Sequence, residues 1–149
     1  MTGGLAGAAL LVVAEFTSLL SVHSGLHATA VRVVQTGSHN SYALIPIALL
    51  AALLSLAARG AHSPLVLLAL GVLGVAALLI ALVGDLPDAQ ASGLILGPAG
   101  RYAIASSSPE VGFYLETLGA VILLIAAGAG LLLTAPRGTP TPARHARSG

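Results

Sequence analysis

The stretch PLVLLALGVLGVAALLIALV, residues 64–83, decides the fold, because it contains no charged and no hydrogen-bonding side chain. A transmembrane helix needs about 20 consecutive apolar residues, whereas a helix on the surface of a soluble protein keeps one polar face. Ser63 and Pro64 form a typical helix start, since serine suits the N-cap position and proline suits the first turn. We therefore expect a membrane-spanning helix over residues 64–83.

Three further apolar runs have the length of a membrane span, over residues 5–22, 42–58 and 110–134. The 149-residue chain is 56% hydrophobic and only 7% charged, with a mean hydropathy of +0.98. Soluble domains carry about a quarter charged residues, and a soluble fold of this size needs that polar surface to cover its core. The sequence predicts an all-α membrane protein: a four-transmembrane-helix bundle in one domain, residues 1–135, with the lipid bilayer as its first partner.

The arginines predict the orientation in the membrane. A four-span topology places four of them on the side of the termini and two on the other side: Arg59, Arg137, Arg144 and Arg147 against Arg32 and Arg101. The side richer in Arg is normally cytoplasmic. We expect a multi-pass plasma-membrane protein with cytoplasmic N- and C-termini, a disordered cytoplasmic tail over residues 136–149, and two longer extracytoplasmic loops.

A cleaved signal peptide is the alternative interpretation of the first apolar run. Ala28-Thr29-Ala30 has the small-residue pattern of a cleavage site. However, no Lys or Arg precedes the run, and Glu15 lies inside it, whereas signal peptides have a basic start and an uninterrupted apolar segment. The sequence favours a retained first span and leaves cleavage open.

Two acidic residues fall inside predicted spans. Glu15 lies about 15 Å along the first span at 1.5 Å per residue, which is close to the bilayer midplane. A charged acid there costs about 2.5–3.5 kcal/mol on insertion scales, so it should face the bundle interior or water. Glu116 lies nearer the outer surface. Both, together with Ser18, are candidates for a proton or cation relay; the alternative is that they only form hydrogen bonds between helices.

Small residues recur at helical spacing in the first and fourth spans. One stripe comprises Gly4, Ala8, Leu11, Glu15 and Ser18, and the other comprises Glu116, Gly119, Ala120, Leu123, Ala127 and Gly130. Helices in membranes approach each other closely through such stripes. We therefore expect these two helices to pack against each other, with both Glu residues in the same half of the bundle.

The Ala14-Glu15 pair in the first span resembles the small multidrug resistance transporters. That resemblance implies that Glu15 exchanges protons for a cationic substrate. This chain is longer, has longer loops and lacks the membrane Trp of that family. As a whole it also resembles uncharacterised four-span membrane proteins of high-GC bacteria, a likeness that implies no activity.

A set of histidines and an acid defines a second candidate site on the outer side. His23 and His27 have i, i+4 spacing, and His39 and Asp85 fall at the same level of the predicted topology. Imidazole and carboxylate together are ligands that suit Zn²⁺. The sequence thus allows an extracytoplasmic metal- or ligand-binding site.

Several functions lack any sequence support. The chain has no Cys, and its net charge of +1 gives no basic face for nucleic acid. It contains no nucleophile elbow and no glycine-rich phosphate or dinucleotide loop, so we expect no catalytic residues and no cofactor. We expect a non-enzymatic accessory or interaction subunit, bound to a membrane protein or a second copy. The alternatives are a small proton- or cation-coupled transporter and a metal- or ligand-binding protein.

Overall fold

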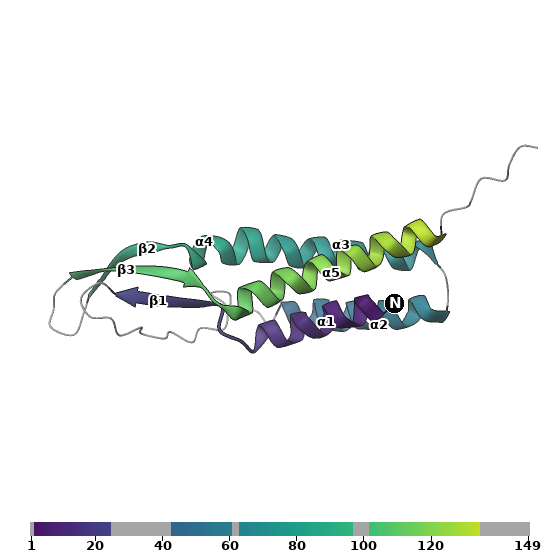
Figure 1. The fold of residues 1–149 in the computed structure, drawn as a ribbon, viewed down its shortest axis with the longest axis horizontal. Coiled ribbons are helices and arrows are strands. Elements are labelled where there is room, and N and C mark those ends of the chain that lie inside the picture. The colour runs from purple at the N-terminus through teal and green to yellow at the C-terminus, as the bar shows by residue number, and fades with distance from the viewer. Residues whose placement is uncertain (1, 25–42, 61–62, 97–101, 135–149) are drawn as a thin grey trace, which may run out of the picture.

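Four helical rods form an elongated bundle in the computed structural model, which describes residues 2–24, 43–60, 63–96 and 102–134 (Figure 1). The first two rods are α1 (Thr2–Glu15) and α2 (Leu44–Gly60). The third runs without a break through α3 (Pro64–Leu79), the π-helix η1 (Ile80–Asp85) and α4 (Leu86–Ala89). The fourth is α5 (Val111–Thr134). The mostly helical fold predicted from the apolar runs is confirmed.

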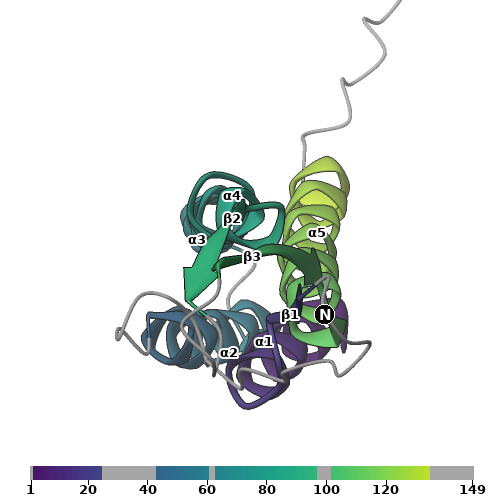
Figure 2. The same cartoon turned by 90° about the vertical axis from the view of Figure 1, so that its left-hand side faces the viewer.

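A three-stranded antiparallel sheet lies at one end of the bundle (Figure 1). Its strands are β1 (Leu20–Ser24), β2 (Ser92–Leu96) and β3 (Tyr102–Pro109), in the order β1-β3-β2. The N-terminus, the end of α2 and the end of α5 lie at the opposite end (Figure 1). Figure 2, which looks along the bundle from the sheet end, shows the sheet across the ends of the helices.

The sheet corrects the all-α expectation, and it also shortens the first helix. We predicted a helical span over residues 5–22, but α1 begins at Thr2 and ends at Glu15, and residues 20–24 form β1. The Thr17 hydroxyl donates to the Ala14 carbonyl over 2.9 Å, which satisfies a backbone acceptor at the helix end. Beyond it, the backbone of β1 pairs with β3, more than 80 residues away in sequence.

The third rod is longer than the predicted span over residues 64–83. The predicted span stops before Gly84 and Asp85, but the helix passes through both residues and continues to Ala89. The amide of Leu86 donates to the carbonyl of Ala81, five residues earlier, which is the π-helical pattern. The backbone hydrogen bonds thus continue across the glycine with one wider turn.

The predicted packing of the first helix against the fourth is confirmed. The buried faces of α1 and α5 are lined mainly by small residues, and the two helices lie in extensive contact. A Cβ atom on Gly7 would lie 2.9 Å from the Gly119 carbonyl oxygen, and one on Gly119 would lie 3.0 Å from the Gly7 carbonyl oxygen. The two backbones therefore touch at this crossing, which only glycine permits.

The outer faces of the helices are apolar. Leu53 in α2, Val72 in α3 and Ile125 in α5 are each at least 60% exposed, and similar side chains cover the other outer positions. Two helical segments, Pro64–Ala89 and Val111–Thr134, are long and apolar enough to cross a membrane. The other two helices, α1 and α2, are apolar but shorter.

Candidate functional site

Three acidic side chains from three helices approach one another at the end of the bundle that carries the sheet (Figure 1). Glu15 is the last residue of α1, Asp85 is the last residue of η1, and Glu116 lies near the start of α5. The carboxyl group of Glu116 lies close enough to those of Asp85 and Glu15 to interact electrostatically with both, and Glu15 also interacts with Asp85. We call these three residues the carboxyl cluster.

Glu116 is the most buried member of the carboxyl cluster. Its side chain is 0% exposed, and neither carboxylate oxygen has a hydrogen-bond donor beside it. The neighbouring group is the carboxyl of Asp85, which lies close enough to interact with it. An ionised carboxylate only accepts hydrogen bonds, so the two groups can form a hydrogen bond only when one of them carries a proton. The Asp85–Glu116 pair is therefore a candidate proton-binding site.

The π-helical turn positions Asp85. Asp85 is 6% exposed and lies on the same face as the fully buried Ala81, four residues earlier. Val83, on the opposite face, is 70% exposed. A π-turn inserts one extra residue into the helix and rotates the side chains that follow; such turns recur at functional sites. Here the turn directs an acid into the bundle at the point where the apolar run ends.

Glu15 connects the carboxyl cluster to the start of α2. Its carboxylate accepts a hydrogen bond from the amide of Leu44, the first residue of α2. The first amides of a helix have no partner within the helix, and a negative charge there is favoured by the helix dipole. Glu15 thus holds the end of α1 against the beginning of α2, while Asp85 and Glu116 hold the third rod against α5.

No basic side chain lies beside the carboxyl cluster in the part of the chain that the structure describes. The basic side chain described there is Arg59, in the last turn of α2. Leu44 and Arg59 are at opposite ends of that helix, about 22 Å apart at 1.5 Å per residue. Buried charges are stable only when they are paired or neutralised. Glu116, which is wholly buried and has no hydrogen-bond partner, is the member of the carboxyl cluster whose ionisation would cost most.

The structure brings together two of the three predicted relay residues. Glu15 and Glu116 interact, although Glu15 lies at the end of its helix and not at the middle of a span. Ser18 lies beyond α1, where its carbonyl accepts a 2.9 Å hydrogen bond from the Gly112 amide. Ser18 therefore fixes the chain leaving α1 against the start of α5. The sequence did not predict that Asp85 belongs to the carboxyl cluster, because a Gly-Asp pair after an apolar run is typical of a helix end.

The predicted metal ligands do not form a described site. His27, His39 and the side chain of His23 lie outside the described residues; the backbone of His23 pairs with Ser106 in the sheet. Asp85 is buried in the carboxyl cluster and not in a surface turn. Among residues 2–24, 43–60, 63–96 and 102–134, no three His, Cys, Asp or Glu side chains are arranged to hold a metal ion.

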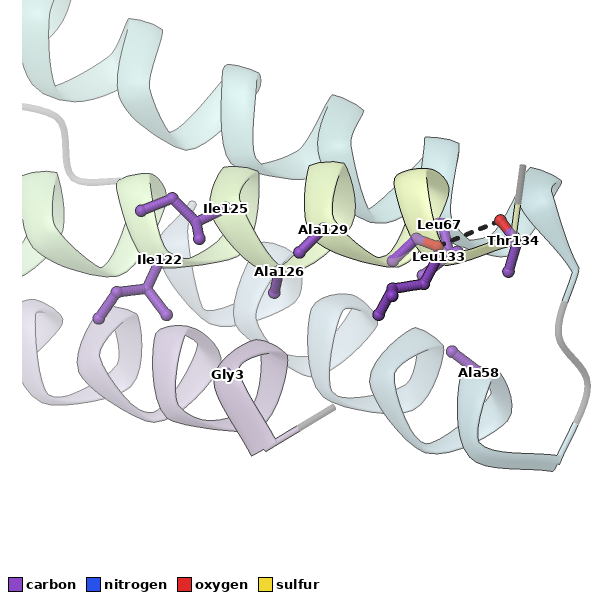
Figure 3. A pocket seen from close by; sticks show the side chains of 10 residues that line it. Gly3, Ala58, Leu67, Ile122, Ile125, Ala126, Ala129, Leu133 and Thr134 are labelled. Atoms are coloured by element: carbon purple, nitrogen blue, oxygen red, sulfur yellow. Dashed lines mark hydrogen bonds between the residues drawn. The ribbon is translucent and has the colours of Figure 1, made fainter. Parts of the chain in front are cut away.

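A hollow with a volume of ≈ 530 Å³ lies at the end of the bundle opposite the sheet (Figure 3). Residues of all four rods line it, including Gly3, Ala58, Leu67 and Ile122. The hydroxyl of Thr134 is its polar side-chain group, and this hydroxyl donates to the Gly130 carbonyl of its own helix (Figure 3). The hollow thus offers apolar surface but no free side-chain donor for recognising a polar ligand.

The carboxyl cluster, the π-turn and the apolar outer surface are the features from which a function can be argued. Sequence and structure comparisons add no relative with a known role. The chain matches no protein-family model, no curated protein and no solved structure.

Proposed function

We propose that the protein spans a lipid bilayer with its four helices and binds and releases a proton at the carboxyl cluster, as a small proton-coupled transporter. The observation that carries this proposal is the wholly buried Glu116, which interacts with the carboxyl groups of Asp85 and Glu15 and has no hydrogen-bond donor beside it in the described bundle. The proposed orientation places the Arg59 end in the cytoplasm and the sheet on the outer side.

The apolar outer surface supports the membrane location. Burial of apolar surface is worth about 25 cal/mol per Å², so side chains such as Leu53 and Ile125 would be costly to leave in water on every face of the molecule. Monomeric soluble proteins rarely expose large continuous apolar surfaces. Lipid removes this cost, because the acyl chains are as apolar as the side chains.

The composition of the carboxyl cluster supports a proton over a larger cation. A metal ion needs several oxygen ligands directed at one point, and the described acids do not provide this arrangement. Two carboxyl groups in contact can instead share one proton and titrate as a pair. Acidic residues inside membrane proteins commonly serve such proton relays.

Infrared spectroscopy of the detergent-solubilised protein tests the proton site directly. Over a pH series, the C=O stretch of a protonated carboxylic acid is expected in the wild type and should be lost or shifted in Glu116→Gln and in Asp85→Asn. The amide of Gln can donate to Asp85, so the first variant keeps the contact without the shared proton. Asp88→Asn is the matched control, because Asp88 lies on α4 outside the cluster.

Reconstitution tests the coupling to transport. With a pH-sensitive dye inside liposomes, the wild type should dissipate an imposed proton gradient, or do so once a transported substrate is added, and Glu116→Gln should not. Glu116→Gln liposomes that move protons as fast as the wild type would contradict the proposal. Glu15→Gln is expected to retain partial activity, since its amide oxygen still accepts the hydrogen bond from Leu44.

An accessory or interaction subunit is the second candidate function, and the sheet favours it. Leu94, Tyr102 and Ile104 are 70, 72 and 71% exposed. Leu94 pairs with Ile104 across β2 and β3, and Tyr102 lies two residues from Ile104, so all three share one face. An apolar sheet face is typical of a protein contact. Ile104→Asp should then reduce the mass of the complex extracted from native membranes, while Asp88→Asn should not.

A further inference from the structure

We infer that the hollow at the end of the bundle opposite the sheet binds one acyl chain of a membrane lipid with an anionic phosphate headgroup, and that Arg59 binds the headgroup. This inference rests on the membrane location in the proposed function and not on the carboxyl cluster, which lies at the other end of the bundle. It gives a ligand to a hollow that the proton site leaves without a role.

The hollow exists because α1 is the shortest rod. Gly3, in the first turn of α1, packs against α5, where its Cβ would lie 3.4 Å from that of Ala126. α5 continues from Ala126 for about two more turns to Thr134, whereas α1 begins at Thr2. Leu133 of α5 and Ala58 of α2 line the hollow beyond the beginning of α1 (Figure 3). The ligand would therefore lie where a longer α1 would pack, between α2 and α5.

The hollow has the dimensions of a lipid acyl chain in one half of a bilayer. Its lining on α5 extends from Ile122 to Thr134, which is about 18 Å at 1.5 Å per residue. Half of a hydrocarbon layer about 30 Å thick is about 15 Å. An apolar cavity of about 150 Å³ already binds benzene, and this one measures ≈ 530 Å³. An acyl chain along α5 would thus fit both the length and the volume.

The hollow is open along one stripe of α5. Ile125, Ala129 and Leu133 follow one another at i, i+4 spacing, so they share a face of the helix, and all three line the hollow. All three are exposed, Ile125 by 63% and Leu133 by 80%. The same side chains belong to the apolar outer surface of the bundle. In a bilayer, an acyl chain could enter sideways without passing through water.

The lining selects the apolar part of a lipid and excludes its headgroup. The hydroxyl of Thr134 donates to the carbonyls of Gly130 and Leu131, both in its own helix. The other lining side chains have no polar atoms. Burial of a phosphate without hydrogen-bond partners would be costly, so the headgroup must stay at the end of the bundle.

Arg59 supplies the charge for the headgroup at that end. It follows Ala58, which lines the hollow, and it is exposed in the last turn of α2. Arg59 is the basic side chain in the part of the chain that the structure describes. An arginine side chain extends along apolar surface to the interface, and its guanidinium can donate two parallel hydrogen bonds to a phosphate. The proposed cytoplasmic side of this end agrees with an anionic ligand, because the cytoplasmic leaflet is rich in anionic lipids.

Native mass spectrometry of the full chain in mild detergent tests the headgroup. Phosphatidylglycerol and phosphatidylcholine with identical acyl chains are supplied in equal amounts. The wild type should retain one lipid per chain and favour phosphatidylglycerol about fivefold, which is the effect of one arginine near anionic lipid. Arg59→Gln should retain a lipid without this preference, because its amide is uncharged.

Filling the hollow tests the acyl-chain site in the same spectra. Ala129→Trp places a large side chain in the hollow, so the bound phospholipid should be lost. Ala57→Trp is the matched control, because Ala57 is also an exposed alanine but does not line the hollow. This control should retain the lipid as the wild type does. If Ala129→Trp does not fold, Ile125→Trp fills the hollow from an exposed position one turn away.

The outcomes separate the lipid site from the proposed function. Equal retention of phospholipid by the wild type and the filled variant, or no retention by the wild type, would overturn the lipid site. Retention of a fatty acid or another apolar molecule in place of phospholipid would also overturn it, as would a preference for phosphatidylglycerol that survives in Arg59→Gln. The infrared band of Glu116 would be unaffected in each case, so the proton site would stand. A wild-type chain that stays folded in water without detergent would instead contradict the membrane location on which both depend.

Discussion

Gly119→Val is expected to separate α1 from α5 and to lower the free energy of unfolding by about 3 kcal/mol or more. The new Cβ would lie 3.0 Å from the Gly7 carbonyl oxygen, and Leu11 and Leu10 lie within 3.1 and 3.2 Å of it. The first of these atoms is backbone, so relief requires that the whole helix moves. Thermal unfolding in detergent, followed by helical circular dichroism, measures the loss.

Gly128→Val is the matched control for this prediction. Gly128 lies on the same helix, and a Cβ atom there would meet nothing within 4 Å. Its replacement should leave the melting temperature almost unchanged, apart from the small gain of removing a helical glycine. Gly7→Val should reproduce the loss from the other side of the crossing. Equal melting temperatures for Gly119→Val and Gly128→Val would show that the two helices do not cross at Gly7 and Gly119.

Val75→Arg is expected to prevent stable membrane insertion of the third rod. Val75 is 47% exposed and lies near the middle of the segment Pro64–Ala89. In water, an Arg at an exposed helix position changes stability by no more than about 0.5 kcal/mol. At the centre of a membrane helix it costs about 2.5–3.5 kcal/mol on insertion scales. The fraction of chains that stay in the membrane after alkaline extraction measures the difference.

Val111→Arg provides the comparison at a helix end. Val111 is 62% exposed, more than Val75, but it is the first residue of α5, from which an arginine side chain can reach the headgroups. This variant should insert like the wild type. A Val75→Arg protein that is soluble without detergent and folds normally would remove the basis for a membrane location.

The sequence predicts the helices and their packing faces well, for a physical reason. Helical period places Gly4, Ala8 and Leu11 on one stripe, and the structure buries all three together with the stripe of α5. In an apolar helix, small residues at that spacing mainly allow another helix to approach closely, so the pattern identifies the face that contacts the neighbouring helix. The membrane location, the orientation and the role of each acid remain predictions.

The sheet and the site geometry depend on information that a local pattern does not contain. β1 pairs with a serine-rich segment more than 80 residues later, and its short alternation, Leu20-Ser21-Val22-His23, lies at the end of an apolar run that equally suits a helix. Asp85 follows Gly84, a pair that normally ends a helix, and nothing local predicts a π-turn there. The approach of Asp85 to Glu116 therefore becomes visible only when the helices are placed together.

The rods differ in length, and in a bilayer this difference acts on the lipid. At 1.5 Å per residue, α1 and α2 measure about 21 and 26 Å, whereas the 26-residue third rod measures about 39 Å. The hydrocarbon layer is about 30 Å thick. In a bilayer, the flank formed by α1 and α2 would thin the surrounding lipid, and the third rod would thicken the lipid beside it or tilt. Such mismatch costs fractions of a kcal/mol per ångström. The tilt of the protein should therefore differ between thin membranes with short acyl chains and thicker, stiffer membranes.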